Sequence, residues 1–568
     1  MPIPRRFGHV VAVLVAALLS ACFGNSEQNL TGPGAAGTGE DNGLPGGLLP
    51  GDEKVGPFEP VPLRMRKLLE WQYRNAVRDL LGAEAAAVVT APPDTAVNGY
   101  DSIGASQISV SPDAIGKYEE SALKAAQLAL GNAERRAALI PCQAATSDDA
   151  ACLSQVVRNF GLRAWRRPLS EQEVGEWVAI GQAAGKAYNA FERGVEFAIA
   201  GLLQSPNFLY LVELGEADPD APGRLRLTNY ELATRMSFFL VGTVPDAELL
   251  AAAERGELTD SAQVRAHAHR LMEKPEAKGA IQTFFDEMLG LREFPSMQKE
   301  TTLFPDFDQA LKDAMRQETE QFIQDIVWTR DADVRELFDA PYTFVNADLA
   351  ALYGLPDAPQ TGFARVDLPV STKRAGLFGQ ASFLALKAHT TETAPTLRGK
   401  FIRETLLCQT IGAPPPEVDT SIPESTDDAP KTMRQRLSEH VANPGCAGCH
   451  VLMDPLGLGL ENYDALGRYR EEEHGLPIDP LSAYDNKAPF DGPRSLGALL
   501  REDERVMKCF VKNVFRAATG HVETDGELKP IFEAHAAFAS SGFKMKKLLV
   551  EIVASDAFRF AAKEEVQP

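Results

Sequence analysis

Apolar residues recur along this chain at the spacing of amphipathic helices. Leu69, Tyr73, Val77 and Leu80 fall on one face of a predicted helix, and Gly82 is a residue type that commonly ends one. Capping sequences predict further helix starts at Ser170, Thr228 and Asp260. More stretches with helical period lie at 191–203, 276–289, 308–328, 396–410, 432–441, 506–518 and 546–554.

Alternating strand patterns are scarce, and the best of them runs from Tyr342 to Val345. Loop-rich stretches at 215–223, 357–373, 413–430 and 471–494 separate the helical regions. The pattern therefore predicts an all-α protein in which several small helical modules pack in series, after a signal peptide and a disordered tether.

The first 21 residues have the pattern of an export signal. Two arginines precede an apolar run from Val10 to Leu19, which is too short to span a bilayer. The following Leu-Ser-Ala-Cys resembles the lipobox of bacterial lipoproteins, which implies a lipid on Cys22; Phe23 after it implies sorting to the outer membrane. An ordinary signal peptide is the alternative. Residues 22–60 are rich in Gly and Pro and predict a flexible tether. We expect an exported, lipid-anchored protein, periplasmic or surface-exposed.

The net charge and the absence of several motifs exclude some classes of function. The 568-residue chain carries a net charge of -22, so it would repel nucleic acid. It has no Gly-rich phosphate loop, Gly-x-Ser-x-Gly elbow or His-Glu-x-x-His pair, so no nucleotide cofactor or familiar hydrolase mechanism is predicted. Whether the protein is an enzyme stays open.

The most informative motif is Cys446-Ala-Gly-Cys449-His450, which matches the C-x-x-C-H pattern of c-type heme attachment. Two thiols three residues apart on a helical turn can form thioethers with the heme vinyl groups, and the adjacent histidine can be the proximal iron ligand. Three alternatives remain: a local disulfide, a redox dithiol, and a zinc site completed by His440 or His389.

The remaining cysteines are even in number. Of the seven in the chain, Cys22 is assigned to lipid and two to heme, which leaves four for disulfides in an oxidising compartment. Cys142 and Cys152 are close in sequence and form the simplest pair. Cys408 and Cys509 are then expected to bridge two modules.

The sequence offers several candidates for the sixth iron ligand. His389 is the first choice, because it comes from another segment; Met507 and Met545 are alternatives, as is a five-coordinate iron. Met453 follows His450 by three residues and would lie on the same side of the porphyrin. The acids of this region, Asp454, Glu461 and Asp464, are interpreted as helix caps or partners of nearby arginines.

Several segments resemble a bacterial family of secreted or lipid-anchored proteins built from domains of unknown function. Residues 456–470 resemble domain 1588, and the matching segments of domains 1587, 1595, 1592 and 1585 are 70–81, 163–170, 227–240 with 342–346, and 509–516 with Phe558. The resemblance implies modules at 61–138 (1587), 139–215 (1595), 224–356 (1592), 371–470 (1588) and 490–568 (1585). The family has no established activity, so function rests on the motif.

The leading hypothesis is a protein with one covalent heme c that acts in electron transfer or heme redox chemistry. Its expected partners are the membrane, through the N-terminal lipid, and a redox partner or surface polysaccharide. The alternative is a non-enzymatic surface scaffold that binds polysaccharide or protein, with Cys446 and Cys449 in a structural disulfide.

Overall fold

The computed structural model describes residues 55–107, 110–356, 359, 361–412, 421–442 and 444–563. The predicted signal peptide and Cys22 lie outside these residues. In the described part the chain is predominantly helical, which confirms the predicted fold class. No helix there is both long enough and apolar enough to cross a membrane.

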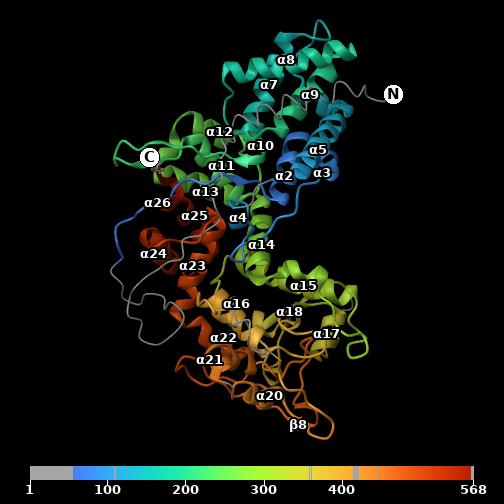
Figure 1. Ribbon diagram of the computed structural model, residues 1–568, viewed down its shortest axis with the longest axis vertical. Coiled ribbons are helices and arrows are strands. Elements are labelled where there is room, and N and C mark those ends of the chain that lie inside the picture. Colours follow the sequence, from blue (N-terminus) through green and yellow to red (C-terminus); the bar gives the residue numbers. More distant parts are fainter. Residues whose placement is uncertain are drawn as a thin grey trace.

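The first hydrophobic core joins the helices of the N-terminal part, which lie together at the top of Figure 1. They are α2 (Glu70–Leu81), α3 (Ala83–Val88), α5 (Pro112–Gly131), α6 (Ala133–Leu139), α7 (Ala150–Trp165), α8 (Glu171–Tyr188), α9 (Phe191–Gln204) and α10 (Pro206–Leu209). Tyr73, Val77 and Leu80 are buried on one face of α2, as their spacing predicts, and Gly82 follows the helix with a φ of 101°.

A second, larger core runs from the middle of the molecule to its lower part and ends in the C-terminal helices. It is built from α4 (Asp101–Gly104), α11 (Asn229–Leu240), α12 (Ala247–Glu254), α13 (Ser261–Met272), α14 (Pro275–Leu289), α15 (Gln309–Ile323), α16 (Glu336–Asp339), α17 (Ala347–Tyr353), α18 (Ala381–Leu386), α19 (Pro395–Phe401), α22 (Pro493–Arg501), α23 (Glu504–Thr519), α24 (Leu528–Ser540), α25 (Met545–Ala554) and α26 (Asp556–Arg559). One continuous core therefore spans segments of the chain that the sequence pattern divides into separate modules.

The caps form largely as predicted. Ser170 and Thr228 each accept a hydrogen bond from the backbone three residues later in a complete capping box. Asp260 caps α13 through the N–H of Ala262 instead. These caps satisfy N–H groups that have no partner inside the helix.

Some predicted elements differ from the structure. The helix expected over 396–410 continues from α19 into a π-helical turn (Ile402–Leu406) and stops there; Cys408, with a φ of 51°, is bonded to α23. The predicted loop at 357–373 contains β6 (Ala364–Asp367), which pairs with β5 (Tyr342–Val345). Strand pairing over this separation in sequence is a tertiary event that local periodicity does not reveal.

Short strands join distant parts of the chain. β1 (Arg66–Lys67) pairs with β2 (Tyr210–Leu211), and β4 (Arg224–Arg226) lies between β3 (Glu216–Ala217) and β9 (Phe560–Ala562). β7 (Glu472–Glu473) and β8 (Leu476–Pro477) form a hairpin. The pairing of β9 with β4 brings the described C-terminal end back to the start of the middle region.

The cysteine motif lies at the lower end of the molecule, on α21 (Pro444–Leu458), next to α20 (Met433–His440) (Figure 1). A small third core of Met433, Leu437 and Leu458 joins these two helices. On its other side α21 packs closely on α19: a side chain on Gly457 would meet the Pro395 carbonyl oxygen at 1.9 Å. The backbone of α21 is therefore fixed by its neighbours.

Candidate functional site

The site begins with two thiols and an imidazole near the N-terminal end of α21. Cys446 and His450 are four residues apart and share a helix face, and Cys449 is on the adjoining turn. Both cysteines are free; Cys446 is buried and Cys449 is half-buried. The local disulfide considered for this motif is therefore not formed in the structure.

His450 is oriented by the residue one turn further along the same helix. Its Nδ1 atom lies 2.9 Å from Oδ2 of Asp454, and the hydroxyl of Thr396 on α19 donates to Oδ1 of Asp454 at 2.8 Å. A carboxylate only accepts hydrogen bonds, so Nδ1 is the donor and carries the proton. This tautomer leaves the lone pair of Nε2 available for a metal, the usual arrangement of a ligating histidine.

An apolar cavity of about 550 Å³ lies beside His450, between α20 and α21. Its volume falls within the range typical of cofactor sites. The side chains that line it are mostly apolar: Leu437, Val441, Ala447, Val451, Pro455, Leu458, Leu481 and Ala483, with Arg434, Ser438, His450, Asp454 and Ser482. Neither cysteine is part of this lining; the cavity meets the motif through Ala447 and His450.

The outer rim of this cavity is exposed and apolar. Val451 is 66% exposed and Leu481 is 59% exposed. Arg434 of α20 holds the loop that carries Leu481, donating to the carbonyl oxygens of Asp479 and Leu481 at 2.9 Å. Two large apolar side chains held at the mouth of one cavity mark a surface suited to an apolar ligand or partner.

A second imidazole reaches the site from α20. The ring of His440 contacts that of His450 edge to face, with centroids 4.8 Å apart. The Nδ1 atom of His440 lies 3.0 Å from the backbone carbonyl oxygen of Ser421. The sequence suggested His440 only as a zinc ligand; the approach of α20 to α21 is what brings it to His450.

The other ligand candidates lie elsewhere. His389 is exposed in the loop after α18, where its backbone N–H donates to the Glu392 carbonyl oxygen, and it does not line the cavity. Met507 and Met545 are buried on α23 and α25 in the second core. Met453 is buried on α21 itself.

The zinc alternative has no support in the geometry. Within the ranges that the structure describes, no three His, Cys, Asp or Glu side chains are grouped so that they could hold a metal ion.

Two of the three acids near the motif are structural, as the sequence analysis expects. Glu461 is buried and pairs with Arg398 at 3.3 Å and with Arg470 at 3.4 Å. Asp464 caps the turn that follows by accepting from the N–H groups of Leu466 and Arg468. Asp454, interpreted from the sequence as a helix cap or an arginine partner, contacts His450 instead; its i+4 spacing from His450 was the available signal.

Both expected disulfides are present. Cys142 is bonded to Cys152 within the first core, and Cys408 is bonded to Cys509 on α23. Disulfides are typical of proteins that fold in an oxidising, extracytoplasmic compartment.

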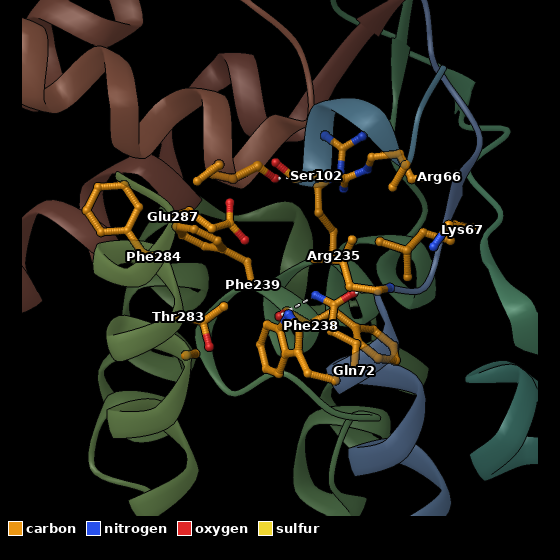
Figure 2. Close-up of a pocket in the computed structure, with 17 residues that line it drawn as sticks. Arg66, Lys67, Gln72, Ser102, Arg235, Phe238, Phe239, Thr283, Phe284 and Glu287 are labelled. Carbon is orange, nitrogen blue, oxygen red and sulfur yellow. Dashed lines mark hydrogen bonds between the residues drawn. The ribbon is translucent and has the colours of Figure 1, made fainter. Parts of the chain in front are cut away.

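A second cavity, of about 70 Å³, lies far from the motif in sequence, where β1, α2, α4, α11, α14 and α23 meet (Figure 2). Near its wall Glu213 pairs with Arg235 and Arg66, and these arginines donate to the carbonyl oxygens of Phe558 and Ala518. Burial raises the pKa of Glu287, which faces this cavity, to about 8. Because the charged groups here pair with one another across the first and last parts of the chain, we interpret this cavity as a structural junction.

The fold and the site together define a multi-module helical protein with two disulfides and a C-x-x-C-H helix. Five family models match it, each described as a protein of unknown function: DUF1587 at 66–131, DUF1595 at 152–213, DUF1592 at 227–355, DUF1588 at 374–473 and DUF1585 at 486–558. The chain therefore belongs to the family of proteins that carry these five domains in this order. The DUF1588 model, which covers the motif, has the short name PSCyt3, which suggests a cytochrome-like domain. Neither the curated proteins nor the solved structures include a match.

Proposed function

We propose that this protein is exported, anchored by a lipid on Cys22, and carries one covalent heme c with which it acts in electron transfer or heme redox chemistry. Cys446 and Cys449 would hold the heme through thioethers, and His450 would be the proximal ligand of the iron. When bound, the heme supplies a one-electron ferric/ferrous couple.

The observation that carries the proposal is the state of His450 and its neighbours. Two free thiols and an imidazole with an uncommitted Nε2 stand on one helix, beside an apolar cavity of about 550 Å³. Asp454 fixes the ring of His450 and holds a proton at Nδ1, so the imidazole needs no change of tautomer to ligate iron. The apolar walls from α20 and α21 would contact a bound macrocycle.

Two further findings support the proposal. The cytochrome-like name of the DUF1588 domain agrees with a heme on this helix. The two disulfides agree with an extracytoplasmic protein, the setting in which heme is attached to C-x-x-C-H motifs.

We propose two partners for the protein. One is the membrane, through the lipid on Cys22; the other is a redox partner that binds at the exposed rim of Val451 and Leu481. The scaffold alternative required a Cys446–Cys449 disulfide, and no observation on the described residues favours it.

The test of heme attachment is expression of the full chain in a bacterial host that has the c-type heme maturation machinery. We expect a red protein whose mass under denaturing conditions is increased by one heme. The double variant Cys446→Ser/Cys449→Ser should be colourless, while Gly448→Ala, which changes only the exposed residue between the cysteines, should keep the heme. A wild-type protein without heme, with both thiols alkylated by iodoacetamide or joined to each other, would refute the proposal.

Anchoring is tested separately. The wild-type chain should partition with outer-membrane lipid and incorporate labelled palmitate. The Cys22→Ala variant should do neither. Its heme content, measured in the cell extract, should equal that of the wild-type protein. Equal membrane association of both proteins would contradict the lipid assignment.

A further inference from the structure

We propose that His440 is the second axial ligand of the heme iron. This inference rests on the proposed function and adds to it, because an iron held by two imidazoles has no open position for a small ligand. The protein would then be an electron carrier rather than a heme enzyme that activates a bound substrate.

His440 and His450 stand on the two helices that line the apolar cavity. His440 is the last residue of α20, the helix that forms one wall of the apolar cavity, and His450 stands on α21, which forms the facing wall. The two imidazole rings are in contact, with centroids 4.8 Å apart and ring planes inclined at 62°. His440 thus approaches His450 from the opposite helix, so the two imidazoles would be able to hold one iron between them.

His440 and His450 have the same hydrogen-bonding pattern at Nδ1. The Ser421 carbonyl oxygen, 3.0 Å from Nδ1 of His440, can only accept a hydrogen bond, so Nδ1 carries the proton. Asp454 imposes the same tautomer on His450. Both rings therefore keep the lone pair of Nε2 for a metal. A backbone carbonyl and a carboxylate are the two partners that most often orient a ligating histidine.

His440 is at a place in the fold that can be displaced. The two rings are in contact here, so His440 would have to move away from His450 for a heme to be held between them. His440 is half-buried and ends its helix, where backbone carbonyl groups lack partners within the helix and the last turn is the easiest part to displace. By contrast, His450 is fixed by Asp454 and by the close packing of α21 on α19.

The alternatives are placed less well. Neither His389 nor His440 lines the cavity, but the ring of His440 contacts that of His450, whereas His389 is exposed on the loop after α18. Met507 and Met545 lie in the second core, on helices that do not form the cavity.

The experiment compares variants of the full chain that has been matured with heme. Optical and electron paramagnetic resonance spectra should show a six-coordinate, low-spin ferric iron in the wild-type protein. His440→Ala should convert it to a high-spin form, and added imidazole should restore the low-spin spectrum. His389→Ala is the matched control and should leave the spectrum unchanged. His440→Met keeps a ligand at this position and should raise the reduction potential, because a methionine ligand favours ferrous iron.

The outcomes separate this inference from the proposed function. Absence of covalent heme from the wild-type protein, measured by mass, would overturn both. Covalent heme with an unchanged low-spin spectrum in His440→Ala, or loss of the low-spin spectrum in His389→Ala alone, would overturn the assignment of His440 and leave heme attachment intact. Circular dichroism of each variant verifies that the helices are retained.

Discussion

The Nδ1 atom of His450 lies 2.9 Å from Oδ2 of Asp454, one turn further along α21. This contact links the residue that the motif marks as an iron ligand to an acid with no place in the motif. It is supported from α19 by the hydroxyl of Thr396. The pair sets both the direction of the imidazole and the nitrogen that is free to bind a metal.

Asp454 should tune the iron that His450 binds. A carboxylate partner makes an imidazole a stronger donor and stabilises ferric iron, so Asp454→Asn should raise the reduction potential. If the substitution lowers the preference for ferric over ferrous iron tenfold, the reduction potential rises by about 59 mV, because the couple transfers one electron. Redox titration of the heme-loaded protein measures the shift.

A control separates this effect from a general loss of negative charge. Glu439 lies on α20 and pairs with Lys431 at 2.7 Å, without a contact to either imidazole. Glu439→Gln also removes one negative charge near the site and should change the potential much less. Equal shifts in the two variants would show that Asp454 does not act through His450.

The close packing of α21 on α19 should be sensitive to one methyl group. A Cβ atom on Gly457 would lie 1.9 Å from the Pro395 carbonyl oxygen, so Gly457→Ala should destabilise this region by about 1–3 kcal/mol. Gly448, on the same helix, has open space around it, so Gly448→Ala should be neutral or stabilising because alanine favours the helix. Thermal unfolding of the two variants compares them; a lower midpoint for Gly448→Ala than for Gly457→Ala would contradict the packing argument.

Glu318 should make stability depend on pH. Its carboxyl group is fully buried and accepts from Thr343 and Tyr353, and burial raises its pKa to about 7. The folded state therefore binds the proton more tightly than the unfolded state, in which the pKa is near 4.5. The stabilisation is fully present below about pH 4.5 and is lost as the pH rises through about 7, a change on the order of 3 kcal/mol.

The test of this dependence is chemical denaturation between pH 4.5 and 8. The unfolding free energy of the wild-type protein should decline over this interval. Glu318→Gln keeps a neutral side chain at every pH and cannot titrate, so its profile should be flatter, and the wild-type protein should lose stability relative to it as the pH rises from 4.5 to 8. Parallel profiles would mean that Glu318 does not bind its proton differently on folding.

The two disulfides should contribute unequally. Cys142 and Cys152 are separated by 10 residues, and Cys408 and Cys509 by 101. The chain-entropy model assigns roughly 3 kcal/mol to the short loop and roughly 5 kcal/mol to the long one. Replacing Cys408 and Cys509 by alanine should therefore lower the denaturation midpoint more than replacing the other pair, and the reverse order would count against this model.

Much of the fold could be predicted because the sequence signals for a helix lie in residues that are close to one another in the chain. The apolar face of α2, the boxes at Ser170 and Thr228, and the strand from Tyr342 to Val345 all depend on residues within a few positions of one another. The helix expected to reach residue 410 stops at Leu406, because a disulfide to a distant helix and the conformation of Cys408 determine its end.

The sequence by itself determined the chemistry that this chain offers: the C-x-x-C-H motif, the even set of remaining cysteines and the helical modules. Only the tertiary structure decided how these parts meet. It merged separate modules into a continuous core, paired β9 with β4, and set His440 of α20 against His450 of α21. The physical reason is that motifs and helical periods are properties of neighbouring residues, whereas a ligand set and a cavity depend on how helices pack, which is settled by contacts between residues far apart in the chain.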